Sequence, residues 1–454
     1  MYQINDSEEE VSKIEIKMDT INLQVESIKQ QRKELTVPGI VGLVNVGNTC
    51  YLNSALQNLF ATDLLAVYFV GTRETEAEYK NDLKHGCIVS IMNEKKCLID
   101  EIDVQTMYKK FRESLTYTLR NLFVLGWNEN CKIKPAQFKD NLGRKNKMFI
   151  GFRQHDSQEA LSFIIDKVHE ETKTDVEANI VNLSETYTEY LQVYEKYLEN
   201  MKNHDLSEEE KHVMHVKYMD YRKDKLRSSA VISYLFYWKT FLKNNHSPII
   251  DIFTGLFISQ ISCQTCKNIT FSFEPYNIIP LPIEEKDNTI SLSDCLDNFL
   301  LKDDQLLGNN QYECQYCNTK CNAEKKSMLW SIPPRLIIQL KRFTNHSRIN
   351  TTIDFPIEEL DMSKYMSEYT SSKCIYDLYG VIVHSGGLNS GHYVSFTKNP
   401  VNSLWYLYDD AKVLQIENNT LEARIKNSGA YVLLYSERKK IRTECLESTR
   451  ESDL

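Results

Sequence analysis

The sequence predicts an α+β fold in which most helices precede most strands. Between Gly39 and about Glu170, apolar residues recur at helical spacing, as at Leu52, Leu56 and Leu59. From Ser247 onward, short β-branched and aromatic runs alternate with turn residues, a pattern typical of antiparallel strands. The expected strands are residues 249–257, 268–273, 278–283, 336–340, 378–383, 393–396, 404–408 and 431–435.

The composition is that of an ordinary globular protein. Of the 454 residues, 42% are hydrophobic and 26% are charged. The formal net charge of −9 argues against a nucleic-acid partner, because a general nucleic-acid binder normally carries an excess of basic residues. The N-terminus lacks the pattern of a signal peptide, and no apolar run approaches the length of a membrane span. We therefore expect no membrane partner and an intracellular, cytoplasmic or nuclear, location.

The first 37 residues carry a heptad-like apolar pattern that ends at Pro38. One interpretation is an amphipathic helix that packs on its own domain or is only partly ordered. The other is a short coiled coil, with a second copy or with a partner, through residues 11–35. The apolar positions are Val11, Ile14, Met18, Ile21, Val25, Ile28 and Leu35.

The stretch from Gly42 to Phe60 predicts a loop followed by a helix that begins at about Cys50. Gly42, Asn45, Gly47 and Asn48 are residue types that tolerate unusual backbone angles. A cysteine in the first turn of a helix lies among unpaired N–H groups at the positive dipole end, which favours the nucleophilic thiolate. Asn45 can donate to an oxyanion near Cys50. The alternative is an inert buried cysteine at a helix start.

Residues 171–246 are polar and predict a helical region. Ser207 followed by Glu210 is a capping box that opens a helix of about twenty residues. His212 and His215 share one face of that helix. Without acidic residues nearby, such a pair is more typical of a solvated face than of a metal site.

Two Cys-x-x-Cys pairs, separated by residues 267–313, predict a zinc site. The four thiolates, from Cys263, Cys266, Cys314 and Cys317, provide a tetrahedral ligand set. Cys321 lies close enough in sequence to compete for the fourth position. The alternative is a pair of β-hairpins held by packing alone. The twelve cysteines are used unevenly, which indicates metal binding and catalysis and not a disulfide framework.

A histidine and an acidic residue near the C-terminus complete a candidate thiol-hydrolase set. A general base needs a fixed imidazole and a third group that orients its other nitrogen. His392 begins an expected strand, and Asp409 follows it across a turn at residues 399–403. A hairpin of this length brings the two side chains together. His384 belongs to the preceding strand, so we interpret it as a neighbour and not as the base.

These motifs together resemble the ubiquitin-specific protease (USP) family of deubiquitinases. The order and spacing hold from about Pro38 to Tyr435. Ala160 departs from the family pattern, which has phenylalanine there. The matching segments are Gly42 to Phe60, Gln154-His155-Asp156-Ser157-Gln158-Glu159-Ala160-Leu161, His384-Ser385-Gly386-Gly387, Ser390-Gly391-His392-Tyr393, Tyr406 to Asp410, and Ala430-Tyr431-Val432-Leu433-Leu434-Tyr435.

The resemblance implies a papain-like fold with a helical thumb that carries Cys50, a β palm that carries His392 and Asp409, and zinc-bearing β fingers at about residues 255–330. It implies a catalytic domain at residues 38–436, with 171–246 as a helical insertion and 437–454 as a polar tail. It also gives Asp410 an auxiliary role. The residues implied to bind the substrate are Gln154, Asp156, Gly386, Gly387 and Tyr393.

The implied activity is hydrolysis of the peptide or isopeptide bond after the C-terminal glycine of ubiquitin, by a Cys-His-Asp triad and through an acyl-enzyme. The partners would be ubiquitin and ubiquitinated proteins. Two alternatives remain: a catalytically inactive ubiquitin-binding scaffold of the same fold, and a zinc-dependent binding module without thiol chemistry.

Overall fold

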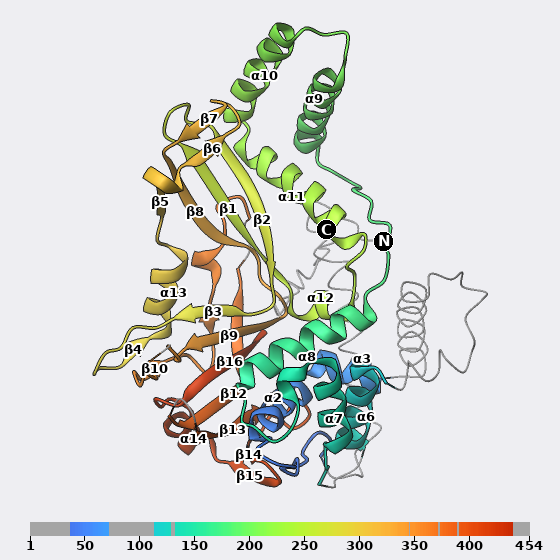
Figure 1. Cartoon of the computed structure of the whole chain (residues 1–454), viewed down its shortest axis with the longest axis vertical. Helices are drawn as coiled ribbons and strands as arrows, with labels where there is room; N and C mark the ends of the chain where they lie inside the picture. Colours follow the sequence, from blue (N-terminus) through green and yellow to red (C-terminus); the bar gives the residue numbers. More distant parts are fainter. Residues whose placement is uncertain are drawn as a thin grey trace, which may run out of the picture.

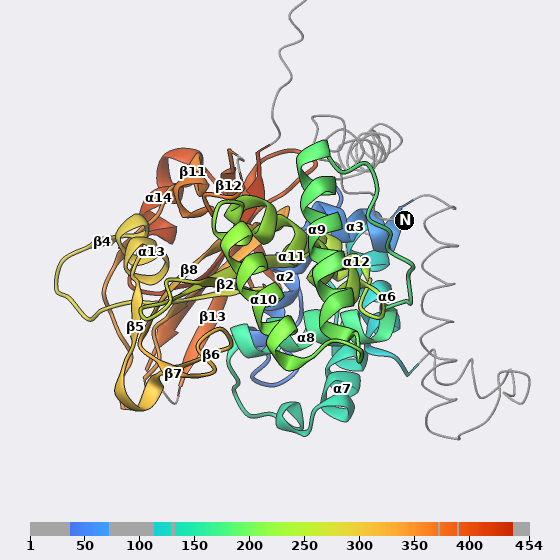
Figure 2. The ribbon, with the colours of Figure 1, turned by 90° about the horizontal axis from the view of Figure 1, so that it is seen from above.

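The computed structural model describes residues 37–71, 113–128, 132–344, 346–370, 373–387 and 390–438. Within them, the predicted α+β division is confirmed: helices dominate up to residue 253 and strands dominate beyond it. Figure 2 shows the thumb helices on one side of the molecule and the palm strands on the other. The heptad pattern at residues 11–35 and nearly all of the polar tail lie outside the described residues. Within the described part of the chain, no helix combines the length and the apolarity that a bilayer crossing requires.

The thumb is built around one fully buried helix, α2 (Cys50–Phe60). This helix packs between α8 (Ser157–Thr172) of the thumb and strand β13 (Gly391–Lys398) of the palm (Figure 1). One continuous core joins α2 and α8 to palm residues Ile382 and Val432. The first residue of α2 therefore lies where thumb and palm meet. The other thumb helices are α3 (Asp63–Val70), α6 (Leu115–Asn128), α7 (Ala136–Lys145) and α8 (Ser157–Thr172).

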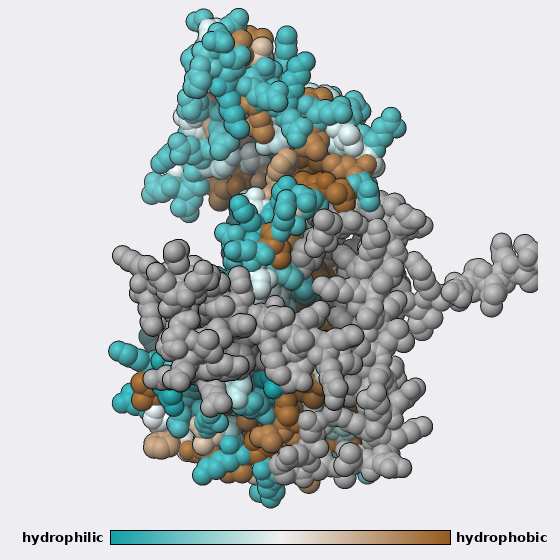
Figure 3. All heavy atoms as spheres, turned by 90° about the vertical axis from the view of Figure 1, so that its right-hand side faces the viewer, coloured by the Kyte–Doolittle hydropathy of each residue, from teal (hydrophilic) through white to brown (hydrophobic). Residues whose placement is uncertain are grey.

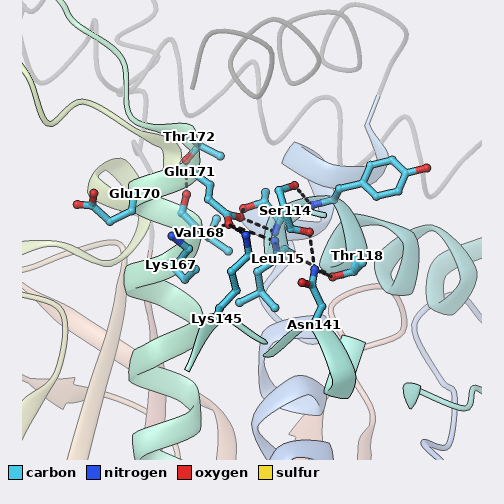
Figure 4. A network of polar contacts seen from close by, with 12 residues as sticks. Ser114, Leu115, Thr118, Asn141, Lys145, Lys167, Val168, Glu170, Glu171 and Thr172 are labelled. Atoms are coloured by element: carbon cyan, nitrogen blue, oxygen red, sulfur yellow. Dashed lines mark hydrogen bonds and ion pairs between the residues drawn. The ribbon is translucent and has the colours of Figure 1, made fainter. Parts of the chain in front are cut away.

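A polar network fixes α6, α7 and α8 to one another. Figure 4 shows Glu171 pointing from α8 toward the start of α6, where its carboxylate accepts from the N–H groups of Leu115 (3.2 Å) and Thr116 (2.8 Å). A carboxylate at this position satisfies free N–H groups and is stabilised by the helix dipole. Asn141 of α7 donates to the carbonyl of Ser114 at 2.9 Å. The network fixes the C-terminal end of α8 and the helix α7 to the start of α6.

The palm is a long twisted sheet with strand order β15-β14-β13-β12-β16-β9-β3. Neighbouring strands are antiparallel, except that β3 and β9 are parallel. In the β12–β13 ladder, Ser385 lies opposite His392 and His384 lies opposite Tyr393. The strands are β3 (Ile279–Pro282), β9 (Arg335–Lys341), β12 (Ile375–Gly386), β13 (Gly391–Lys398), β14 (Trp405–Asp409), β15 (Lys412–Ile416) and β16 (Ala430–Glu437).

The fingers form a second sheet that projects from the palm (Figure 1). Its strand order is β2-β1-β8-β5, and a small β6–β7 hairpin lies at its tip. The strands are β1 (Gly255–Cys263), β2 (Ile269–Tyr276), β5 (Asp304–Leu306), β6 (Tyr312–Cys314), β7 (Thr319–Cys321) and β8 (Ala323–Ser331). Between fingers and palm lies α13 (Leu292–Leu300), and α14 (Asn418–Ile425) precedes β16.

One predicted strand is wrong over half of its length. Residues 249–257 were expected to be extended, but α12 (Pro248–Phe253) is a helix, and β1 begins only at Gly255. The Ser247 side chain caps the helix by accepting from the Ile250 N–H, and Pro248 occupies its first turn. This start signal and burial of four apolar side chains against the core outweigh the β-branched composition. The four are Ile249, Ile250, Ile252 and Phe253.

Residues 171–246 are mainly helical, as predicted. They form α9 (Glu185–Lys202), α10 (Glu208–Lys223) and α11 (Leu226–Leu242). The capping box of Ser207 and Glu210 is present. Helix α11 packs on the fingers sheet, with Tyr234 against Trp330. On the face in Figure 3, hydrophilic side chains cover most of the outer part of this region, and hydrophobic ones gather below them.

The expected solvated face of α10 is confirmed for His212 and wrong for His215. His212 is exposed, but His215 is half-buried. The His215 ring bonds the Tyr197 hydroxyl at 2.8 Å and lies 5.6 Å, centroid to centroid, from the ring of Tyr316 at the fingers tip. Packing of α10 against α9 and the fingers removes this histidine from solvent.

Candidate active site

Cys50 is the first residue of α2, as the sequence predicts, and its side chain is buried. The preceding loop turns through left-handed backbone at Gly47 (φ +117°) and Asn48 (φ +53°). The Asn45 side chain fixes that loop, because its Oδ1 accepts from the N–H groups of Gly47 at 3.0 Å and Thr49 at 3.1 Å. The loop residues therefore set the position of the thiol.

The surroundings of the Cys50 thiol disfavour its charged form. Burial raises the pKa of Cys50, and the negative charge of Asp410 acts in the same direction. Hydrogen bonds from the backbone N–H groups of Tyr393, Tyr51 and Cys50 lower that pKa by less. The thiolate that the helix start favours stays a prediction, and burial of the thiol acts against it. A nearby base would promote ionisation of Cys50.

His392 and Asp409 supply an oriented imidazole. His392 Nε2 lies 2.6 Å from Asp409 Oδ1. The two residues come from the adjacent antiparallel strands β13 and β14. Asn399 closes the turn between these strands: its N–H donates to the Leu404 carbonyl, and its side-chain oxygen accepts from the Val401 N–H. With Nε2 engaged by a carboxylate, Nδ1 is the nitrogen left for proton transfer. The next residue, Tyr393, donates its N–H to Cys50, which brings this strand to the thiol.

Asp410 links the cysteine loop to the palm. Its Oδ2 accepts from Asn45 Nδ2 at 2.9 Å, and its Oδ1 accepts from Asn53 Nδ2 at 2.8 Å. Its carbonyl accepts from the Leu43 N–H at 3.0 Å. A ring nitrogen of His392 and one carboxylate oxygen each of Asp409 and Asp410 lie within 4.8 Å of one another. Asp410 thus holds the side chain of Asn45 in place.

Asn53 belongs to this arrangement and was missed in the sequence. It is buried, and it donates both to Asp410 and to the Leu43 carbonyl (3.1 Å). The available signal was a polar residue one turn after Cys50 on a helix that is buried on every side. Buried polar groups of this kind normally have hydrogen-bond partners that come from elsewhere in the chain.

Gln154 and Asp156 lie at the start of α8, on the thumb side of the boundary between thumb and palm. Gln154 makes a two-way contact with the backbone of Gly391, donating to its carbonyl at 3.0 Å and accepting from its N–H at 3.2 Å. Asp156 caps α8 through Oδ1, and its Oδ2 accepts from the Tyr431 hydroxyl at 2.6 Å. Burial raises the pKa of Asp156, and no cationic side chain of the described residues offsets this. Tyr431 is a second residue that sequence analysis did not single out for the site.

Gly386, Gly387 and Tyr393 lie at the β12–β13 turn. Gly386 has φ +129°, and a Cβ there would lie 2.4 Å from the Ser390 carbonyl oxygen, so the turn requires glycine. Gly387 has open space around it. The Tyr393 ring packs against His384 at 4.5 Å. Burial and the charges of Arg348 and His392 lower the pKa of His384 to about 4, so His384 is a buried neighbour, as predicted.

The four cysteines of the Cys-x-x-Cys pairs form a cluster at the fingers tip that can hold a metal ion. All four sulfurs lie within 4.8 Å of one another, with Cys263–Cys317 at 4.0 Å and Cys266–Cys314 at 3.7 Å. Four sulfurs around a tetrahedral zinc, with Zn–S about 2.3 Å, are separated by about 3.8 Å. The donor set fits that ion. Cys321 is not part of the cluster, and its sulfur faces the Thr319 carbonyl at 3.6 Å.

A buried thiol, an oriented imidazole–carboxylate pair and a loop asparagine at a thumb–palm boundary define a candidate cysteine hydrolase. The model of the ubiquitin carboxyl-terminal hydrolase family matches residues 41–435. The chain belongs to this family, whose USP members are cysteine-protease deubiquitinases.

Individual relatives agree with this assignment. A probable ubiquitin carboxyl-terminal hydrolase of Acanthamoeba polyphaga mimivirus is 29% identical over 429 residues, which cover 87% of this chain and 90% of the viral protein. The human ubiquitin carboxyl-terminal hydrolase 2 is 28% identical over 404 residues, and the match spans only 55% of that protein. A solved structure, the SAGA Ubp8/Sgf11/Sus1/Sgf73 DUB module bound to ubiquitin aldehyde, has a TM-score of 0.54 at 22% identity, covering 89% of this chain and 72% of the other. This likeness concerns the fold.

Proposed function

We propose that the chain is a deubiquitinating cysteine protease, with residues 38–436 as its catalytic domain, that hydrolyses the peptide or isopeptide bond after the C-terminal glycine of ubiquitin. The observation that carries the proposal is the 2.6 Å contact between His392 Nε2 and Asp409 Oδ1. The residue after His392, Tyr393, donates its N–H to Cys50, so this pair lies beside the thiol. Every position of a Cys-His-Asp triad is occupied.

In this mechanism His392 takes the proton of the Cys50 thiol at Nδ1, while Asp409 stabilises the imidazolium. The sulfur attacks the carbonyl carbon of the terminal glycine, and Asn45 Nδ2 with neighbouring N–H groups stabilises the oxyanion. Collapse breaks the bond to the lysine nitrogen, which receives the proton from His392. Water, deprotonated by His392, then attacks the thioester, releasing the ubiquitin carboxylate and the Cys50 thiol.

We assign binding of the substrate to the residues that the sequence predicted for it. The similar DUB module is described as bound to ubiquitin aldehyde, and we assign ubiquitin as the partner here. The tail of ubiquitin would run past Asp156, Gln154 and Tyr393 toward Cys50, with Gly386 and Gly387 leaving room for it. The half-buried carboxylate of Asp156, without a cationic neighbour among the described residues, is suited to one of the tail's arginines.

A ubiquitin probe with an electrophilic C-terminus separates this proposal from an inactive ubiquitin-binding scaffold. An active enzyme forms a covalent adduct at Cys50, and the adduct disappears in Cys50→Ala. A scaffold binds the probe without a covalent bond. The same gel excludes a zinc-dependent binding module without thiol chemistry, which forms no adduct either.

Asn45→Ala is expected to lower kcat by about 10²–10³-fold with little change in KM, because one oxyanion donor is removed. Asn45 also organises its loop, so a second variant is needed. The exchange Asn45→Asp with Asp410→Asn keeps a hydrogen bond between the two positions, in the reverse direction, and keeps the Oδ1 acceptor for the loop. It removes the amide donor, so the loss should persist. Recovery of kcat in the exchanged pair would show that Asn45 acts only on loop structure.

We also propose that the four-cysteine cluster binds zinc structurally. Elemental analysis should find about one zinc per chain. Cys314→Ser should lose the metal and lower the melting temperature, because structural zinc sites contribute folding free energy. Cys321→Ser, a neighbouring cysteine outside the cluster, is the matched control and should keep both. A metal-free preparation with unchanged stability and activity would refute the zinc proposal.

A further inference from the structure

Three apolar side chains stand in solvent beside the cysteine loop. Met148, Ile150 and Phe152, which we call the ridge, are 45%, 59% and 72% exposed. Phe152 and Ile150 are the two most exposed large hydrophobic residues in the described part of the chain. Exposed apolar side chains that lie next to one another on a protein surface often mark an interaction site.

The ridge is held rigidly. Phe149, between two ridge residues, is fully buried and packs against Tyr51 and His155. The ammonium of Lys139, itself only 7% exposed, donates to the carbonyl oxygens of Phe149 and Gly151. These contacts direct one side chain inward and fix its neighbours outward, so the exposure of the ridge is built into the fold.

The ridge is continuous with the active site. Asn48, two residues before Cys50, donates from its amide to the Phe152 carbonyl at 2.8 Å. Gly47 lies so close that a Cβ there would be 2.3 Å from the Phe152 ring. Three contacts order the segment from Asp156 back to Phe152. Asp156 accepts from the Tyr431 hydroxyl, Gln154 bonds the backbone of the residue before His392, and the Phe152 carbonyl accepts from the cysteine loop. If the ubiquitin tail lies at Asp156 and Gln154, the ridge lies beyond the scissile bond, on the leaving side.

The border of the ridge is strongly basic in an acidic chain. Residues 132–153 contain seven Lys or Arg residues and one acidic residue, Asp140, while the whole chain has a net charge of −9. A hollow of about 550 Å³ is lined by Lys134 and Arg144 together with Ile150 and Phe152. Both basic side chains belong to exposed residues. The surface therefore offers apolar contact and positive charge together.

We propose that the ridge and its basic border bind the leaving-side protein, through an apolar side chain flanked by Asp or Glu near the lysine that carries ubiquitin. This proposal rests on the proposed function. Ubiquitin's own surface around its tail is basic and would be repelled by Lys134 and Arg144. A leaving-side protein with Asp or Glu beside its lysine is attracted by the same two charges. Its apolar side chain would cover the ridge and remove apolar surface from water.

The test compares three substrates: ubiquitin with a C-terminal fluorophore amide, and ubiquitin linked through an isopeptide bond to a peptide whose lysine is flanked by Glu and Leu, or by Lys and Ser. The natural chain should cleave the acidic conjugate faster than the basic one, by about fivefold in kcat/KM at low salt. Lys134→Glu with Arg144→Glu should reverse that order. Ile150→Ser should lower kcat/KM for the acidic conjugate relative to the fluorophore amide.

Matched controls lie on the insertion. Val213→Ser changes a side chain that is 51% exposed on α10, and Lys196→Glu with Lys202→Glu changes two exposed charges on α9. Neither should alter the ratio of the conjugates. If the ratio of kcat/KM for the acidic conjugate to kcat/KM for the basic one is the same in the natural chain and in the ridge variants, the proposal is overturned. Parallel loss on all three substrates would place ubiquitin itself on the ridge and also overturn it. Failure to cleave even the fluorophore amide would instead count against the proposed function.

Discussion

Replacing Cys50 by alanine is expected to reduce hydrolysis of ubiquitin substrates to background, a loss on the order of 10⁶-fold in kcat. In the proposed mechanism the thiol forms the covalent bond to the substrate, so its removal leaves no nucleophile. Ubiquitin binding should persist, because the side chain is only 3% exposed and offers little surface to a partner. Turnover of a ubiquitin fluorophore amide and titration calorimetry with ubiquitin measure the two effects.

Cys295→Ala is the matched control for this prediction. Cys295 is also buried, at 4% exposure, but it lies in α13, away from the cleft. Both variants lose one buried sulfur, so a stability loss common to both identifies the packing contribution. Residual turnover well above background in Cys50→Ala would show that the nucleophile has been misassigned.

The parts of the fold that depend on short segments were predictable. A loop rich in Gly and Asn before an apolar helix placed the start of α2 at Cys50, and the short connection between His392 and Asp409 brought those two side chains together. The Cys-x-x-Cys spacing likewise predicted the sulfur cluster. In each case, local geometry and the hairpin leave few alternatives.

The parts that depend on tertiary packing were not predictable. The raised pKa of Cys50 arises from burial between α2 and the palm, which no local motif encodes. The roles of Asn53 and Tyr431 depend on which distant carboxylate each one meets. The run at Ile249–Phe253 has the composition of a strand, yet a proline and a serine cap at its start make it a helix.

Asp156→Asn is expected to lower kcat/KM on ubiquitin substrates by about thirty- to several-thousand-fold, the second large effect. In the proposed complex, the ubiquitin tail, Leu-Arg-Leu-Arg-Gly-Gly, would bring two guanidinium groups near Asp156. A carboxylate–guanidinium pair is charge-assisted and often bidentate. Breaking a desolvated pair costs about 2–5 kcal/mol, because the remaining charge loses its partner. At about 1.4 kcal/mol per decade, this gives the stated range.

The choice of asparagine separates a tail-binding role from a purely structural one. Asp156 Oδ1 caps α8, and Oδ2 accepts from the Tyr431 hydroxyl. Asparagine is as good an N-cap as aspartate, because its oxygen keeps the capping acceptor. Its NH₂ group then faces the Tyr431 hydroxyl and can donate to that oxygen, so the melting temperature should change little. Asp156→Ala loses the cap as well and should also lose about 1 kcal/mol of stability.

Tyr431→Phe completes the design, because it removes the hydroxyl donor and leaves the carboxylate charge in place. If the charge binds the tail, this variant should retain much more activity than Asp156→Asn. In all three variants, Cys50 should react with iodoacetamide at the rate seen in the natural chain, since the thiol and its base are untouched. An Asp156→Asn chain with full activity would restrict Asp156 to capping its helix. Slowed alkylation in that variant would instead trace the loss to the position of Cys50, because Ser157, the residue after Asp156, donates to the carbonyl of Tyr51, the residue after Cys50.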